Sequence, residues 1–176
     1  MNIKNNVISK NSRTVFKKSL IELLDEKYIS EISVTELCNK ANMNRSTFYS
    51  HYENVIDVLD EIQNDIYEEL ENYLNDSQSL NGTLNECLSY VKQNSNVFKV
   101  LLSQKGNERF KNIISKLSFD TYKPKNNADS EFVYHRIFNI NGFVGIIEHW
   151  LNTGMEEDVE YLSDVILKFS YLENEK

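Results

Sequence analysis

The chain has 176 residues, with one proline, five glycines and a net charge of −8. So few helix-breaking residues predict a nearly all-helical fold, and the length allows one good core or two small ones. No apolar run approaches the ~18 residues of a membrane span and no signal-peptide core is present, so we expect a cytoplasmic protein without a membrane partner. Cys38 and Cys87 lie within helical patterns and are expected to be reduced core residues.

The charge is unevenly distributed along the chain. Residues 1–55 carry eight Lys or Arg against six Asp or Glu, a balance of +2, whereas the remainder has a balance of −10. The overall acidity argues against nucleic acid as a partner. A mildly basic N-terminal segment beside an acidic remainder nevertheless suits a DNA-binding head on an acidic body.

The N-terminal segment, residues 1–9, is polar and is expected to form a flexible arm. Lys4 and Lys10 would allow such an arm to reach a phosphate or the minor groove, and the alternative is a disordered tail. A helix is predicted over residues 10–27, because Phe16 and other apolar residues recur there near the 3.6-residue period.

Residues 33–52 are predicted to form two short helices joined by a four-residue turn. Ser33, with Glu36 three residues later, forms a capping box that begins the first helix. Asn42 is one of the few non-glycine residues that tolerate a left-handed turn conformation, and Asn44 is a suitable cap for the second helix.

The second of these helices, residues 45–51, has almost no aliphatic residue. Phe48 and Tyr52 are four residues apart and can anchor it from below. Its outer face carries hydrogen-bonding side chains: Arg45, Ser46, Thr47, Tyr49, Ser50 and His51. A short helix with one aromatic face and donors on the other is what a reader of the DNA major groove requires.

A long helix is predicted to follow, with Asn54 as its cap and an end near Asn75. It has an apolar stripe on one side and an acidic face on the other, and it is long enough to link a head to a second domain mechanically. A polar loop over residues 76–82 comes next, and Thr83 with Glu86 predicts a capping box for the following helix.

Two apolar helices are predicted near the end of the chain, over residues 129–152 and 156–171. A short helix over 97–102 and another helix over 107–122 are predicted to precede them. We expect the last two to form a symmetric four-helix dimer interface, in which glycines allow close approach. The interface residues predicted are Ile140, Gly142, Val144, Gly145, Ile147, Leu162, Ile166 and Phe169. The alternative is that both helices close the core of the monomer itself.

An effector pocket is expected among the apolar residues of this second half. Its candidates are Phe98, Leu102, Phe110, Ile114, Tyr134 and Phe138. The alternative, that they are ordinary core, stays open. His135 and His149 lie ~21 Å apart along one helix and cannot bind the same metal ion within a chain. No catalytic motif is found, so we expect neither an enzyme nor a cofactor or metal site.

The head resembles the DNA-binding domain of TetR-type (tetracycline-repressor-like) transcriptional regulators. The resemblance covers about residues 10–60 and rests on VTELC at 34–38 and ANMNRSTFYSHYEN at 41–54. Two positions depart from the family pattern. Asn42 stands where the family has a turn glycine, and Val55 stands where it often has a lysine that touches phosphate.

A second segment, FVGIIEHWLNTGM at residues 143–155, resembles one subgroup that includes regulators related to dihydroxyacetone-kinase control. The layout of helices after the head is similar to the effector-binding and dimerisation domain of the family. The resemblance therefore implies an arm at 1–9, a helix-turn-helix domain at 10–54 and a C-terminal domain at 55–176, with about nine helices in all.

Such a protein is expected to be a homodimeric, sequence-specific DNA-binding regulator, most simply a repressor. It would bind a palindromic operator in double-stranded DNA and respond to a small-molecule or protein effector. By position in the family motif, the DNA contacts fall to Thr35, Arg45, Ser46, Thr47, Tyr49 and His51. The alternative is a TetR-like protein-interaction module or co-regulator that has lost or weakened DNA binding.

Overall fold

The computed structural model describes residues 3–76, 79–103 and 130–171. Within these ranges all regular secondary structure is helical, in eight α-helices and one 3-10 helix, so the all-α prediction is confirmed. None of the helices in these ranges is both long and apolar enough to cross a membrane.

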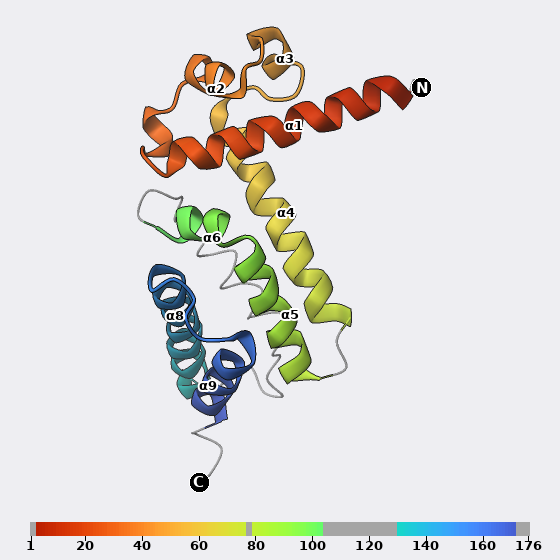
Figure 1. The fold of residues 1–176 in the computed structure, drawn as a ribbon. Coiled ribbons are helices and arrows are strands. Elements are labelled where there is room, and N and C mark those ends of the chain that lie inside the picture. Colours follow the sequence, from red (N-terminus) through yellow and green to blue (C-terminus); the bar gives the residue numbers. More distant parts are fainter. Residues whose placement is uncertain (1–2, 77–78, 104–129, 172–176) are drawn as a thin grey trace.

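The N-terminal head consists of α1 (Ile3–Leu24), a 3-10 helix (Ile29–Glu31), α2 (Val34–Ala41) and α3 (Arg45–Tyr49). α1 crosses the upper part of the molecule in Figure 1, below α2 and α3; α2 packs against α1, and α3 packs against α2. The backbone is helical from Ile3 onward, so residues 3–9 of the segment predicted to be a flexible arm belong to the first turns of α1. This helix ends at Leu24, earlier than the predicted end at Lys27.

The long helix α4 (Val55–Asp76) leaves the head and runs down the body beside α5 (Leu80–Gln93), as Figure 1 shows. α6 (Ser95–Leu102) lies under the head, where it packs against both α1 and α8 (Ser130–Asn152). α9 (Val159–Tyr171) packs on α5 at the far end of the body. α4 therefore connects the two ends of the molecule, as its predicted length requires.

The start of α4 is fixed by reciprocal capping. The Asn54 side-chain oxygen accepts hydrogen bonds from the backbone nitrogens of Ile56 at 2.8 Å and Asp57 at 3.3 Å. The Asp57 carboxylate in turn accepts from the backbone nitrogens of Glu53 at 2.8 Å and Asn54 at 3.0 Å. These bonds satisfy backbone donors that have no partner inside the helix, and they confirm Asn54 as the cap.

The sequence pattern predicts Thr83 as the cap of α5, and this prediction was wrong. The Ser79 hydroxyl accepts from the Gly82 backbone nitrogen at 3.1 Å, so α5 begins at Leu80. The Thr83 hydroxyl donates to the Ser79 carbonyl at 3.0 Å and lies inside the helix instead of opening it. Ser79 and Thr83 are both good caps, and the choice between them depends on packing that the local pattern does not contain.

One hydrophobic cluster runs through the head and the body. It includes fully buried side chains of the head, such as Phe16 and Leu37, together with Leu59 of α4, Leu101 of α6 and Trp150 of α8. A head of roughly fifty residues is too small to bury a sufficient core alone, and sharing the core compensates for its size. The hydrophobic core is therefore continuous across the predicted boundary after residue 54.

Candidate nucleic-acid interface

α2 begins with the cap that the sequence predicts. The Ser33 hydroxyl accepts a hydrogen bond from the Glu36 backbone nitrogen at 3.2 Å. The Glu36 carboxylate binds the Lys27 ammonium group instead of completing a capping box, which ties α2 to the segment that follows α1. Asn44 occupies the N-cap position of α3, as predicted, although its side chain makes no capping hydrogen bond.

The turn between α2 and α3 depends on Asn42. Its φ of 51° lies in the left-handed region, as its place after α2 predicts. The backbone then reverses tightly enough for the Met43 nitrogen to donate to the Cys38 carbonyl at 2.9 Å. Asn42 thus adopts the left-handed conformation for which a turn usually requires glycine.

α3 is held from one side by aromatic rings. Phe48 is fully buried, and its ring centroid lies 5.3 Å from that of Phe16 in α1 and 5.5 Å from that of Tyr52. The predicted anchor is therefore present. α3 itself spans Arg45–Tyr49, so it is shorter than predicted and ends before His51.

The predicted DNA-contacting residues fall into two groups by exposure. Thr35, Arg45, Ser46 and Tyr49 are exposed, whereas Thr47 and His51 are half-buried. Thr35 is on α2 and His51 follows α3. The exposed members leave hydrogen-bonding groups open to a partner, as a groove-reading surface requires.

Arg45 is oriented by Tyr49 one turn away. A guanidinium nitrogen of Arg45 donates to the Tyr49 hydroxyl at 3.3 Å, and the guanidinium carbon lies 5.7 Å from the centre of the Tyr49 ring. Tyr49 is 52% exposed, so the ring shields one side of the arginine while the other stays accessible. The family motif assigns Tyr49 to phosphate and gives no indication of this contact, although the i, i+4 spacing permits it.

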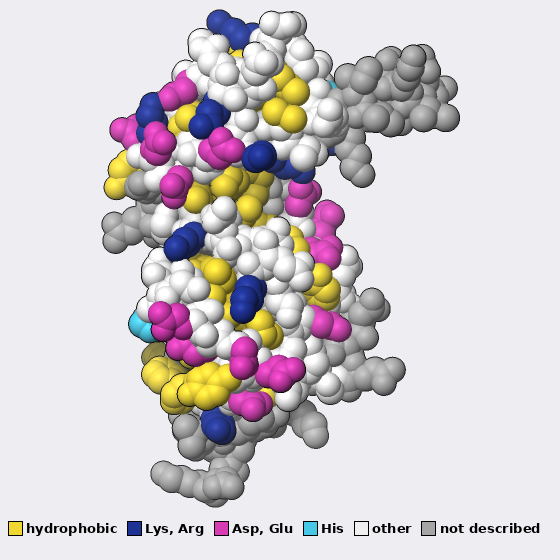
Figure 2. Space-filling model, in the orientation of Figure 1, with side chains coloured by type: hydrophobic (Ala, Val, Ile, Leu, Met, Phe, Trp, Pro, Cys, Tyr) yellow, Lys and Arg dark blue, Asp and Glu magenta, His cyan; other side chains and the backbone are white. Residues whose placement is uncertain are grey.

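Most described cations of the head are paired with carboxylates of the same chain. Lys40 binds Glu22 at 3.1 Å, and Lys27, Arg13 and Lys17 have acidic partners as well. On the face shown in Figure 2, basic and acidic side chains accordingly lie interspersed over the head. Among the lysine and arginine side chains described between residues 11 and 55, only those of Lys18 and Arg45 lack an acidic partner.

Val55 lies where the family often has a lysine that touches phosphate. Its side chain is only 6% exposed and belongs to the shared core. A phosphate contact from this position is therefore absent, and the head has one cation fewer than the family pattern.

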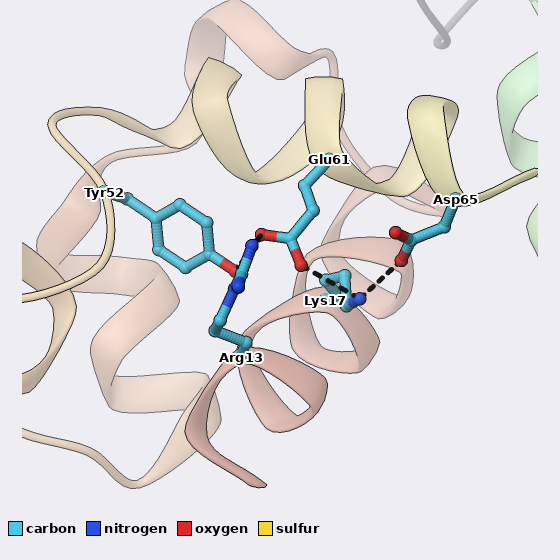
Figure 3. Close-up of polar contacts among 5 residues, drawn as sticks. All are labelled: Arg13, Lys17, Tyr52, Glu61 and Asp65. Atoms are coloured by element: carbon cyan, nitrogen blue, oxygen red, sulfur yellow. Dashed lines mark hydrogen bonds and ion pairs between the residues drawn. The ribbon is translucent and has the colours of Figure 1, made fainter. Parts of the chain in front are cut away.

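A polar cluster at the junction of α1 and α4 was missed by the sequence reasoning. Figure 3 shows Arg13 and Lys17 of α1 meeting Glu61 and Asp65 of α4, together with the hydroxyl of Tyr52. The sequence predicts an acidic face on α4 but gives no partner for its carboxylates. The arginine and Glu61 are 48 positions apart, and no local pattern signals a contact at that separation.

The four effector-pocket candidates that the structure describes do not all face inward. Phe98 and Leu102 of α6 are buried, whereas Tyr134 and Phe138 of α8 are each 72% exposed. Phe110 and Ile114 lie outside the described residues. Only the two α6 residues therefore remain as inward-facing candidates within the described part of the chain.

The predicted dimer-interface residues also separate into two groups. Four are buried within the chain itself: Ile140, Ile147, Leu162 and Ile166. The other four are exposed or half-buried: Gly142, Val144, Gly145 and Phe169. The buried group therefore serves the chain's own core. The sequence could not assign these faces, because α8 is apolar around most of its circumference.

Comparison with known proteins shows similarity to transcriptional regulators. A family model described as "Transcriptional regulator C-terminal region" (TetR_C_8) matches residues 78–171, more than half of the chain. The HTH-type dhaKLM operon transcriptional activator DhaS of Lactococcus lactis subsp. lactis (strain IL1403) is 26% identical over 132 residues, which cover 70% of this chain and 67% of that protein. The uncharacterized HTH-type transcriptional regulator YxbF of Bacillus subtilis (strain 168) is 27% identical over 103 residues, 53% of this chain and 27% of YxbF.

Solved structures show the same fold. A TetR transcriptional regulator from Streptococcus agalactiae 2603V superposes with a TM-score of 0.70 at 24% identity, covering 96% of this chain and 98% of the other. The dihydroxyacetone kinase operon activator DhaS superposes with a TM-score of 0.60 at 20% identity, covering 90% and 93%. The DhaS matches agree with the subgroup that residues 143–155 resemble. The chain belongs to the TetR family of transcriptional regulators.

Proposed function

We propose that the chain is a homodimeric repressor that binds a palindromic DNA operator through α3 and is controlled by an effector bound in the body. The construction of α3 carries this proposal. A five-residue helix at one end of the molecule is fixed by a buried phenylalanine and offers Arg45, Ser46 and Tyr49 to a partner. Donors held rigidly on a narrow element suit the major groove, where base edges form a unique hydrogen-bonding code.

The outer face of α8 supports a dimer. Tyr134, Ile137 and Phe138 are 72%, 49% and 72% exposed, and a side chain added at Gly142 or Gly145 would meet nothing within 4 Å. These five positions share one face of the helix at helical spacing. In Figure 2, hydrophobic side chains gather at the lower left, where α8 and α9 lie.

A second copy of the chain would cover this apolar face, and the open glycines would let its helix approach closely. We therefore place the dimer contact on Tyr134, Ile137, Phe138, Gly142 and Gly145. Two-fold symmetry then presents two copies of α3 to half-sites about 34–36 Å apart.

Effector control is proposed to act through α6 and α4. α6 packs against both α1 and α8, so a ligand that displaces Phe98 or Leu102 would disturb the underside of the head. α4 would carry a change in the body to the same place. A ligand that releases DNA should then alter the distance between the two heads, measured between spin labels, and an unchanged distance would refute this route.

The Arg45→Ala variant should bind the operator more weakly by about 1–3 kcal/mol and lose its preference at one base pair, since arginine paired with guanine is the commonest specific contact. Lys18→Ala serves as the comparison, because Lys18 is the other unpaired cation described in the head and should weaken binding to all sequences alike. Gel-shift titrations on specific and scrambled DNA distinguish the two. An equal loss on both DNAs for Arg45→Ala would show that Arg45 contacts only phosphate.

The salt dependence of operator binding should be shallow for a DNA-binding protein. With two unpaired cations described in each head, and so four in the dimer, we expect a slope of log K against log salt of roughly −4. Titration between about 50 and 200 mM salt measures it. A slope near −10 would mean that the paired lysines leave their carboxylates for phosphates.

A gel shift on the DNA upstream of the chain's own gene, at low and moderate salt, tests the proposal as a whole. Retarded DNA that resists scrambled competitor supports it. Absence of a complex even at low salt would favour the alternative of a protein-interaction module, which the weak charge of the head also suits.

The sign of the regulation is a second question, because the L. lactis relative is named as an operon activator. If this chain activates, deleting its gene should lower transcription from a reporter driven by the bound operator. If it represses, as we propose, the same deletion should raise transcription.

A further inference from the structure

A cluster of five polar side chains, the Glu61 cluster, joins three segments of the chain: Arg13 and Lys17 of α1, Tyr52 after α3, and Glu61 and Asp65 of α4 (Figure 3). The Glu61 Oε2 atom accepts from Arg13 Nε at 3.0 Å and from the Tyr52 hydroxyl at 2.8 Å, and it lies 2.7 Å from Arg13 Nη2. The Glu61 Oε1 atom lies 3.0 Å from Lys17 Nζ, which also binds Asp65 at 2.5 Å. Both oxygens of Glu61 are therefore occupied.

The Glu61 carboxylate is largely removed from solvent, since its side chain is only 15% exposed. Burial by itself raises the pKa of Glu61, but hydrogen bonds from Arg13, Tyr52 and Lys17 outweigh it and bring the pKa below its ordinary value. The group is thus an anion at neutral pH. Charge-assisted hydrogen bonds of this kind are stronger and more directional than neutral ones.

α3 has only five residues and depends on its surroundings for its orientation. The ring of Phe48 connects it to Tyr52, and the ring of Phe16 lies 6.2 Å from that of Tyr52. The Tyr52 hydroxyl then reaches Glu61. A continuous path of contacts therefore leads from α4 through Tyr52 and Phe48 to the helix that presents Arg45.

The remaining contacts between the head and α4 include the apolar side chains of Val55, Val58 and Leu59. Hydrophobic burial is itself non-directional. Hydrogen bonds weaken steeply when their geometry changes. The Glu61 cluster therefore adds directional contacts between α1, Tyr52 and α4 to the capping bonds of Asn54 and Asp57 at the start of α4.

We propose that Glu61 is a positioning residue that holds α3 in a fixed orientation relative to α4, so that a movement of α4 is passed on to α3. Without this cluster, the movement would be absorbed in the segment between α3 and α4. The inference rests on the proposed DNA-binding function for its purpose, but the orientation itself is testable without DNA.

The test uses the full chain with spin labels at two exposed positions, Ser46→Cys on α3 and Asn64→Cys on α4, diluted into unlabelled protein. Burial raises the pKa of the native Cys87 thiol to about 11 and that of Cys38 above its ordinary value, so both native thiols should react slowly with the label. In Glu61→Gln the distribution of label distances should become clearly broader than in the unsubstituted chain.

Glu22→Gln is the matched control. It makes the same chemical change, also removes one negative charge, and breaks the exposed Lys40–Glu22 pair between α2 and α1. Its distance distribution should equal that of the unsubstituted chain. Operator affinity should fall about tenfold in Glu61→Gln, as for the loss of one charge-assisted hydrogen bond, and should not fall in Glu22→Gln. The removed charge alone would strengthen DNA binding, so it cannot explain a loss.

An unchanged distance distribution in folded Glu61→Gln overturns the inference. If that variant does not fold, Tyr52→Phe decides, because it removes only the hydroxyl bond to Glu61 and keeps the ring contacts with Phe48 and Phe16. Broadening in Tyr52→Phe supports the inference, and an unchanged distribution overturns it. If the unsubstituted chain fails to bind DNA while its label distances respond as expected, the proposed function fails and the positioning role of Glu61 stands.

Discussion

The Phe138→Glu variant is expected to be a folded monomer at concentrations at which the unsubstituted chain is a dimer. Phe138 is 72% exposed, so replacing it removes little from the core of the chain itself. In the proposed dimer, the new carboxylate would be buried without a partner, which costs about 3–5 kcal/mol and weakens association by more than about 100-fold. Sedimentation equilibrium measures the dissociation constant, and circular dichroism shows whether the helices remain.

Ile56→Glu provides the comparison for this variant. Ile56 is 52% exposed on α4, so the same kind of substitution is made on an apolar side chain outside the proposed interface. It should leave the dimer intact. A Phe138→Glu chain that dimerises as tightly as Ile56→Glu would exclude the outer face of α8 as the interface.

The Phe48→Ala variant is expected to lose about 3–5 kcal/mol of unfolding free energy. Phe48 is fully buried, and its ring contacts those of Phe16 and Tyr52, so its loss opens a cavity where α3 is anchored. Because the head and the body share one core, the whole chain should unfold in a single transition at lower denaturant concentration. Urea denaturation followed by circular dichroism measures both the midpoint and the number of transitions.

Tyr49→Ala is the control for Phe48→Ala, because it removes an exposed aromatic ring at the next position in the same helix. Tyr49 is 52% exposed, so its removal should change the unfolding free energy by less than about 1 kcal/mol. Two separate transitions in Phe48→Ala, with the body unaffected, would contradict the shared core.

The local features of the head were accessible from the sequence because they depend on residues close together in the chain. Ser33 caps α2, Asn42 has a left-handed conformation and Phe48 is buried, as predicted. Each follows from the chemistry of one side chain and its neighbours within about one helical turn. The all-helical fold followed from the scarcity of proline and glycine in the same way.

Features that depend on distant residues were not accessible. The contact of Arg13 with Glu61 joins two helices far apart in sequence, and an acidic helix face gives no sign of which carboxylate will find a partner. The sequence could not show which side of α8 faces inward, because the helix carries apolar residues around most of its own circumference. Packing against the rest of the chain buries Ile140 and Ile147 and leaves Tyr134 outside.

The orientation of Arg45 could be predicted from the sequence only in part. Its four-residue spacing from Tyr49 is visible in the sequence, yet both side chains could equally have pointed at phosphate. The structure shows the tyrosine contacting the arginine, which gives the Arg45 side chain a defined direction.

Selection of bound DNA from a random pool by the full-length chain tests DNA recognition and dimer symmetry together. We expect enrichment of one sequence with two-fold symmetry, whose half-sites lie about one helical turn apart, 34–36 Å. Phe138→Glu should lose this enrichment, and Arg45→Ala should lose the preference at one position of each half-site. Recovery of no enriched sequence, or of a single half-site without symmetry, would contradict a homodimeric operator-binding regulator.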